Sequence, residues 1–227
     1  DQVAAQLFPE YSRVRLQSWI KDGSLRVNAK SMRPRDHLKT GDLLQIEAEL
    51  VSSEQFLPQP IQLDIIFEDE DLVILNKPVN LVVHPASGHW QGTLLNGLLH
   101  AYPELEAIPR AGIVHRLDKD TSGLMIIARS ANAYEKLKEM IKERSISRNY
   151  EALVYGKPKL KEAIIDAPII RDPKNPIKRR VSIGGKESKT SYRIKKNFEE
   201  YSLLDVKLFS GRTHQIRVHL DHVGHPV

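Results

Sequence analysis

Helical spacing of apolar side chains is clearest in residues 130–142. Tyr134, Leu137 and Ile141 recur every three or four positions, and charged residues occupy the opposite face. Ser130 precedes the pattern and can accept a hydrogen bond from the first turn of a helix. This segment is therefore predicted to be an amphipathic helix that begins after Ser130.

Runs of apolar and β-branched residues predict strands elsewhere. Residues 65–67 and 72–75 flank an acidic turn and are predicted to pair. A leucine-rich helix is predicted to begin after Thr93 and to end before Pro103. It lies in the chain between these strands and the helix predicted after Ser130. These elements predict an α+β domain with a mixed, largely antiparallel sheet. Its later strands are expected at residues 150–155, 188–193, 202–208 and 215–220.

The first fifty residues predict a smaller α/β unit. Ser12 is the candidate N-cap of a helix that ends at Gly23. Short strands are predicted at residues 25–27 and 43–46, after a glycine-containing turn. The unit is large enough to form a compact module of one helix and a small sheet.

Two prolines, Pro58 and Pro60, favour an extended spacer after this module. The predicted organisation is a module at residues 1–50, a linker at 51–61 and a catalytic domain at 62–227. The apolar pattern breaks off at the last residue without a polar tail. We therefore expect the C-terminal part of the domain to be missing from this chain.

Basic residues are concentrated in the N-terminal module. The whole chain has a formal net charge of +5, whereas residues 12–39 alone carry eight basic and two acidic side chains. Such a patch is typical of phosphate binding, although a solvated basic face would have the same composition. The candidate RNA contacts in this patch are Arg13, Arg15, Lys21, Lys30 and Arg33.

Two absences in the sequence narrow the classes of function. The chain has no cysteine, which excludes disulfides and thiolate zinc sites. No stretch approaches the roughly 18 uninterrupted apolar residues of a membrane span, and no signal peptide is visible. We therefore expect a cytoplasmic protein without a membrane partner.

The densest run of chemically capable residues lies at 115–124 and reads His-Arg-Leu-Asp-Lys-Asp-Thr-Ser-Gly-Leu. Apolar residues precede and follow it, so residues 110–128 are predicted to form a strand, a functional loop and a return strand. Asp118 is the candidate carboxylate of this loop. Taken alone, an aspartate in such a loop is more often a turn former or a backbone cap.

Three ordered motifs change this interpretation of Asp118. Residues 115–124 resemble the signature of the RluA family of pseudouridine synthases. Residues 211–219 (Gly-Arg-Thr-His-Gln-Ile-Arg-Val-His) and 148–152 (Arg-Asn-Tyr-Glu-Ala) resemble two further motifs of that family. The N-terminal unit resembles the αL RNA-binding module named after a small-subunit ribosomal protein. The resemblance covers nearly the whole chain.

The resemblance implies an isomerase that converts uridine to pseudouridine in large-subunit (23S) ribosomal RNA or the large-subunit particle, and we expect it to be a monomer. It points to the stem-loop of that RNA at the subunit interface. By their positions in the motifs, Asp118 is the catalytic carboxylate and Arg217 the arginine that pairs with it. Tyr150 matches the tyrosine that packs on the uracil and takes part in removing the C5 proton.

Three loop residues are implied to contact RNA. Arg116 matches the residue that fills the gap left by the extruded base, and His115 and Thr121 either shape the loop or touch the substrate. The isomerisation loses no atoms and involves no redox change, so no cofactor and no metal are expected. A carboxylate near C1′ is expected either to add to that carbon or to drive elimination.

Other functions are compatible with parts of the sequence. A binding module with a relict catalytic loop, such as an RNA assembly factor, would retain the basic patch. A metal-dependent hydrolase could use His214, His219, His222 and His225, but their spacing lacks the His-Glu-x-x-His arrangement and strand alternation would point some rings apart. The basic loop 174–180 is either a grip on the RNA backbone or ordinary solvated charge.

Overall fold

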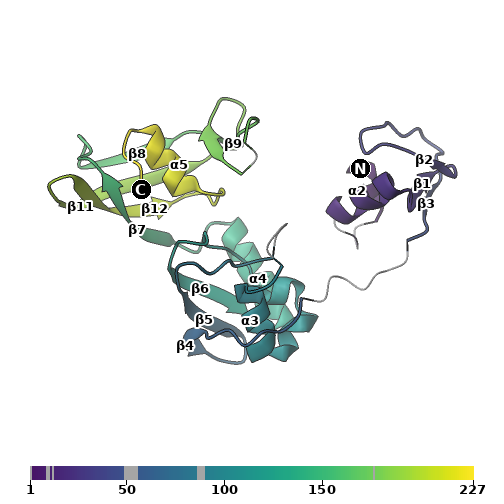
Figure 1. The fold of residues 1–227 in the computed structure, drawn as a ribbon, viewed down its shortest axis with the longest axis horizontal. Coiled ribbons are helices and arrows are strands. Elements are labelled where there is room, and N and C mark those ends of the chain that lie inside the picture. Colours follow the sequence, from purple (N-terminus) through teal and green to yellow (C-terminus); the bar gives the residue numbers. More distant parts are fainter. Residues whose placement is uncertain (1, 9–10, 12, 49–55, 86–89, 176) are drawn as a thin grey trace. The chain divides into compact units, whose positions relative to one another are not determined.

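The computed structural model describes residues 2–8, 11, 13–48, 56–85, 90–175 and 177–227 (Figure 1). The chain divides into two compact units, Asp1–Gln55 and Phe56–Val227. The expected N-cap Ser12 and residues 51–55 of the expected linker lie outside the described residues.

The first unit consists of two helices and a small antiparallel sheet with the strand order β2-β1-β3. Ala4, Leu16, Ile20 and Leu25 form its buried core. Gly23 follows the second helix in a left-handed conformation (φ +84°), which ends the helix as predicted. The elements are α1 (Gln2–Leu7), α2 (Arg13–Asp22), β1 (Leu25–Val27), β2 (Lys30–Ser31) and β3 (Leu44–Ile46).

The first half of the second unit is a three-stranded antiparallel sheet, β4-β5-β6, packed against helices. Both predicted helix starts are confirmed. Ser130 Oγ accepts a hydrogen bond from the Ala133 amide (3.1 Å), and Thr93 is the N-cap of its helix. The elements are β4 (Asp64–Glu68), β5 (Leu72–Lys77), α3 (Leu94–Ala101), η1 (Pro103–Ala107), η2 (Pro109–Gly112), β6 (Gly123–Ala128) and α4 (Ala131–Lys142).

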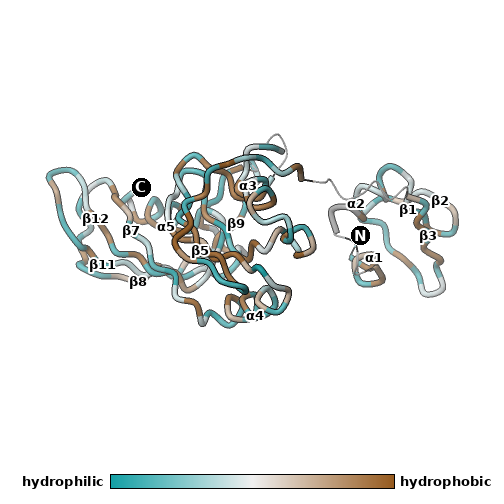
Figure 2. Tube along the Cα trace, turned by 90° about the horizontal axis from the view of Figure 1, so that it is seen from below, coloured by the Kyte–Doolittle hydropathy of each residue, from teal (hydrophilic) through white to brown (hydrophobic). Residues whose placement is uncertain are grey.

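The second half is a four-stranded antiparallel sheet with the order β7-β12-β11-β8, together with a two-stranded hairpin. One face of this sheet packs against a C-terminal helix, where Leu220 meets Ala152, Leu204 and Val206. The elements are β7 (Arg148–Tyr155), β8 (Glu162–Asp166), β9 (Ile169–Arg171), β10 (Arg179–Val181), β11 (Lys189–Asn197), β12 (Tyr201–Leu208) and α5 (Gln215–His222). The α+β class with antiparallel sheets is as predicted. Figure 2 shows the hydrophobic stretches around β5 and long hydrophilic ones along β8 and β11.

The predicted strand at residues 215–220 is wrong, because this segment is the helix α5. Polar and apolar residues alternate along it, which favoured a strand. In the structure, however, Gln215, His219 and Leu220 are the buried residues, and this spacing belongs to one face of a helix. Because two of the residues on the buried face are polar, the sequence shows no helical period of apolar residues. Hydrogen bonds to distant parts of the chain decide the conformation instead.

The strand predicted to enter the functional loop is also absent from the described structure. The chain enters through the 3-10 helix η2 and a single bridge between Ile113 and Ile127. Gly112 explains this tight entry. It has a φ of +73°, and a Cβ atom there would collide with the carbonyl oxygen of Ala128. The return strand is confirmed as β6.

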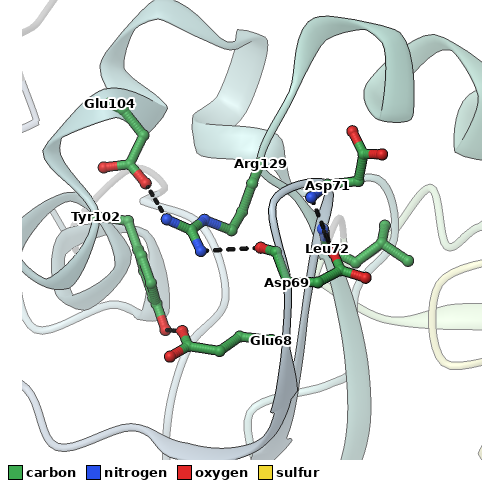
Figure 3. Close-up of polar contacts among 7 residues, drawn as sticks. All are labelled: Glu68, Asp69, Asp71, Leu72, Tyr102, Glu104 and Arg129. Carbon is green, nitrogen blue, oxygen red and sulfur yellow. Dashed lines mark hydrogen bonds and ion pairs between the residues drawn. The ribbon is translucent and has the colours of Figure 1, made fainter.

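A polar cluster holds the β4–β5 turn against the end of β6 (Figure 3). The Arg129 guanidinium donates to Glu104 (2.7 Å) and to the carbonyl oxygen of Asp69 (2.9 Å). Tyr102 lies beneath Arg129 and donates its hydroxyl to Glu68 at 2.6 Å. Burial, with a contribution from Glu68, raises the pKa of Tyr102 to about 12, so the hydroxyl remains a donor. The cluster stabilises the sheet from which the functional loop extends.

Candidate active site

Asp118 and Arg217 meet although they are 99 residues apart in the chain. The Arg217 Nη2 atom donates a hydrogen bond to Asp118 Oδ2 at 2.8 Å. The aspartate side chain is 22% exposed, so one of its oxygens is sheltered by the arginine while the carboxylate still reaches solvent. This contact joins the loop after η2 to helix α5 and places a fixed negative charge between the two halves of the unit.

His214 lies beside the same carboxylate. Its Nε2 atom is 3.9 Å from Asp118 Oδ1, the oxygen that Arg217 does not bind. Burial lowers the pKa of His214, and Arg217, Arg179 and Arg116 lower it further against the opposing effect of Asp118. The imidazole is therefore neutral at neutral pH. In the sequence, His214 stood out solely as a possible metal ligand, and no signal indicated its place beside Asp118.

A buried lysine holds the Asp118 loop from below. Lys77, at the end of β5, is fully buried and donates to the carbonyl oxygens of Pro78 (2.7 Å), Leu81 (2.9 Å) and Lys119 (3.1 Å). Burial lowers the pKa of Lys77, and the nearby Asp120 and Asp118 oppose that change. Its bond to the residue after Asp118 connects the loop directly to the sheet. A lysine at the end of an apolar strand carried no sequence signal for this role.

His115 attaches the start of the loop to strand β6. Its Nε2 atom accepts a hydrogen bond from the Ile126 amide at 3.0 Å, in place of the strand that was expected there. Acceptance requires a neutral ring. Burial, aided by Arg148, lowers the pKa of His115 to about 4. The His115 ring thus makes its hydrogen bond to the protein and not to a substrate, which agrees with a role in shaping the loop.

Helix α5 is positioned by buried polar groups on its inner face. Gln215 donates to the carbonyl oxygen of Lys189 (3.0 Å) and to Thr190 Oγ1 (2.9 Å), and accepts from Ser210 Oγ (2.8 Å). His219 bonds Thr190 Oγ1 at 2.8 Å and the carbonyl oxygen of Ala167 at 2.9 Å through its two ring nitrogens. These contacts fix the helix on the sheet, and thus the direction in which it presents Arg217.

Tyr150 stands on β7 opposite Val206, where it packs against both apolar cores of the unit. Burial raises the pKa of Tyr150, and the charge of Asp118 adds to this effect while Arg148 opposes it. The phenol is therefore protonated at neutral pH.

The remaining candidates lie in the Asp118 loop and on the first unit. Arg116 is exposed beside the buried Leu117, and Thr121 is half-buried, with its amide donating to the Asp118 carbonyl oxygen at 3.1 Å. Lys21, Lys30 and Arg33 are exposed on the first unit. Arg13 and Arg15 belong to α2, and their side chains lie outside what the structure describes.

Neither a metal cluster nor a membrane helix is found in the described part of the chain. Within it, no three His, Cys, Asp or Glu side chains are grouped so that they could hold a metal ion. Among the same residues, no helix has the length and apolar character needed to cross a membrane. The four C-terminal histidines are accordingly dispersed, with His219 bonded inside the sheet and His214 facing Asp118.

A half-buried carboxylate paired with arginine, in a unit that also holds a protonated tyrosine, is an arrangement typical of enzymes of the acid–base or nucleophilic class. Residues 71–222 match the family model described as RNA pseudouridylate synthase. The chain belongs to this family, and the protein is accordingly an isomerase that modifies RNA.

Relatives and solved structures agree with this assignment. The chain is 49% identical over its whole length to ribosomal large subunit pseudouridine synthase D of Pseudomonas aeruginosa, of which it covers 71%. It is 46% identical to the protein of the same name from Escherichia coli K12, again over its whole length and 70% of the relative. The solved structure of human RNA pseudouridylate synthase domain containing 1 has a TM-score of 0.60 at 26% identity, covering 73% of this chain and 67% of that one.

Proposed function

We propose that this protein converts uridine to pseudouridine in large-subunit ribosomal RNA, with Asp118 as its catalytic carboxylate. The observation that carries the assignment is the 2.8 Å bond from Arg217 to Asp118 Oδ2, which orients the carboxylate and leaves Oδ1 for the substrate. The names of the relatives support the RNA target, and the stem-loop at the subunit interface is our candidate within it. We further propose that the enzyme acts as a monomer in the cytoplasm.

The proposed reaction breaks the N1–C1′ bond, turns the uracil and forms a C5–C1′ bond. The proton on C5 leaves and N1 gains one, so the atoms balance without a co-reactant. Asp118 acts at the sugar, either by adding to C1′ or by taking a proton from the ribose. Tyr150 packs on the uracil, and its protonated hydroxyl lies on the route of the C5 proton. Arg116, exposed on the loop, enters the space of the extruded base.

The test is release of tritium from large-subunit rRNA labelled at C5 of uridine, with the wild-type protein and with Asp118→Asn. The asparagine keeps the shape of the side chain but removes its charge and basicity. Wild-type release together with none by the variant, at equal RNA affinity, is the expected result. Equal loss of release and affinity would remove the catalytic role of Asp118. No release by the wild-type protein from naked rRNA or from subunits would contradict the proposed function.

The basic face of the first unit is proposed to hold the RNA backbone. Replacing Arg13 and Arg15 by Ala should weaken binding and reduce the salt slope by about one for each arginine that neutralises a phosphate. Lys136 and Lys142 on α4 are both exposed, and their double alanine variant is the control that removes the same charge elsewhere. Binding measured from low to high salt distinguishes the two. An unchanged slope in the arginine variant would exclude this face as an RNA surface.

A further inference from the structure

The two oxygens of Asp118 have different surroundings. Oδ2 accepts the hydrogen bond from Arg217, whereas Oδ1 faces His214 Nε2 across 3.9 Å. That separation is too long for a hydrogen bond. One oxygen atom about 2.8 Å from each of them would close the gap, with an angle of about 90° at that oxygen. The geometry is thus suited to a single small polar group shared by the two side chains.

The charges around His214 decide whether this group donates or accepts hydrogen bonds. Burial and the positive charges of Arg217 on α5, Arg179 on β10 and Arg116 on the loop lower the pKa of this ring in spite of Asp118, so the ring is neutral at neutral pH. A neutral imidazole can donate or accept through Nε2, according to its tautomer, whereas an ionised carboxylate can only accept. A group that binds both must therefore donate to Asp118, and it can accept from the histidine at the same time. A hydroxyl group meets both requirements.

The backbone conformation of His214 also supports a functional role for its side chain. His214 has a φ of +59°, a left-handed conformation that is uncommon for a residue other than glycine. Such strained positions occur most often at functional sites. Gln215, the next residue, is held by buried hydrogen bonds to the sheet, so the surrounding structure imposes this conformation.

The proposed reaction provides one hydroxyl at the required place. Asp118 acts at C1′ of the target ribose, and the neighbouring carbon carries the 2′-hydroxyl. This hydroxyl is both a donor and an acceptor, and it is the group by which proteins distinguish RNA from DNA. In enzymes that cleave glycosidic bonds, hydrogen bonds to the corresponding hydroxyl strengthen in the transition state.

We propose that His214 Nε2 and Asp118 Oδ1 together bind the 2′-hydroxyl of the target uridine, so that His214 makes the enzyme specific for ribose. This inference rests on the proposed function. His214 is then a catalytic-site residue that touches the substrate, and its contribution should appear in the discrimination between a ribose and a deoxyribose target.

The experiment compares two synthetic rRNA stem-loops that differ at one atom. Each carries 5-tritiated uridine at the same position of the subunit-interface stem-loop, with ribose in one and 2′-deoxyribose in the other. Rates of tritium release are measured at saturating enzyme for the wild-type protein, His214→Asn and His214→Gln. Asparagine tolerates the left-handed backbone but is too short to reach the hydroxyl, and glutamine places its amide near the position of Nε2. His222→Gln, an exposed change on the same helix, is the control.

The expected result is a preference for ribose that falls about tenfold in His214→Asn, as for the loss of one hydrogen bond to a polar group. His214→Gln should recover part of the preference, and His222→Gln should equal the wild type. Because every protein meets the same two substrates, the intrinsic reactivity of the deoxyribose cancels. The same ribose preference in all four proteins would overturn the proposal for His214. No release by the wild type from the ribose stem-loop would instead count against the proposed function.

Discussion

The two segments that build the site, the Asp118 loop and helix α5, are fixed by different kinds of contact. The loop is held beside Asp118 through its backbone, because Lys77 of β5 binds the Lys119 carbonyl oxygen, and at its start through the His115 ring, which accepts from an amide of β6. Helix α5 is held through its side chains, since Gln215 and His219 bond to the neighbouring strands. Loss of the loop contacts should therefore displace the carboxylate itself. Loss of the helix contacts should instead change the direction in which Arg217 points.

Loss of the loop anchor is expected to have the largest effect. Lys77→Met keeps much of the side-chain volume but leaves three carbonyl oxygens without their donor. We expect the free energy of unfolding to fall by about 3 kcal/mol or more, because each unsatisfied buried polar group costs about 1–3 kcal/mol. Urea unfolding followed by circular dichroism measures this, with Lys142→Met on the exposed face of α4 as the control. A loss as small as that of the control would show that the loop does not depend on Lys77.

Loss of the helix anchor should cost somewhat less. Gln215→Leu fits the buried volume but removes the partner of Ser210 and of the Lys189 carbonyl oxygen. We expect about 2 kcal/mol of destabilisation, and a lower rate of tritium release even where the variant is fully folded. If the rate of the folded variant equals that of the wild type, the network does not serve to aim Arg217.

The ion pair between the two segments should matter for rate rather than for stability. Arg217→Ala is expected to slow tritium release by about 30-fold, equivalent to the roughly 2 kcal/mol of a hydrogen bond to a charged group. Arg193 donates to Glu162 at 3.1 Å on an exposed face of the sheet, so Arg193→Ala removes an ion pair outside the site. Similar rates for the two variants would mean that the pair with Asp118 has no catalytic role.

The titration of His115 should produce the smallest effect. The pKa of this ring is about 4 in the folded protein against a usual value of 6.5, so the unfolded chain binds more protons between these values. Stability is therefore fully present above pH 6.5 and is lost as the pH falls towards 4. At pH 5 we expect a loss of about 1–2 kcal/mol from this residue.

His115→Gln tests this expectation, because its amide oxygen can accept from Ile126 without titrating. The variant should lose less stability between pH 8 and pH 5 than the wild type in thermal unfolding. His84, whose pKa is also lowered to about 4 by burial, is present in both proteins and cancels in the comparison. Equal acid sensitivity in both would assign the loss to other groups.

Local elements followed from the sequence where their determinants are local. The capped helix after Ser130 and the pairing of the strands on either side of the acidic turn are both found. Their determinants are an N-cap and a hydrophobic period, which act over a few residues. The motifs also identified Asp118 and Arg217 as a pair, and the structure brings these two side chains together. Their catalytic roles remain predictions.

Helix α5 could not be predicted in the same way. Its residues alternate as in a strand, and only contacts with Lys189, Thr190 and Ala167 make Gln215 and His219 inner-face residues. The sequence by itself thus determined the class of fold and the local elements with clear periods, and its motifs predicted Asp118 as the reacting carboxylate. The tertiary structure alone decided the burial of Lys77, the conformation of α5 and the approach of His214 to Asp118. The physical reason is that a buried polar side chain is stable only with its partners, and those partners lie far away in the chain.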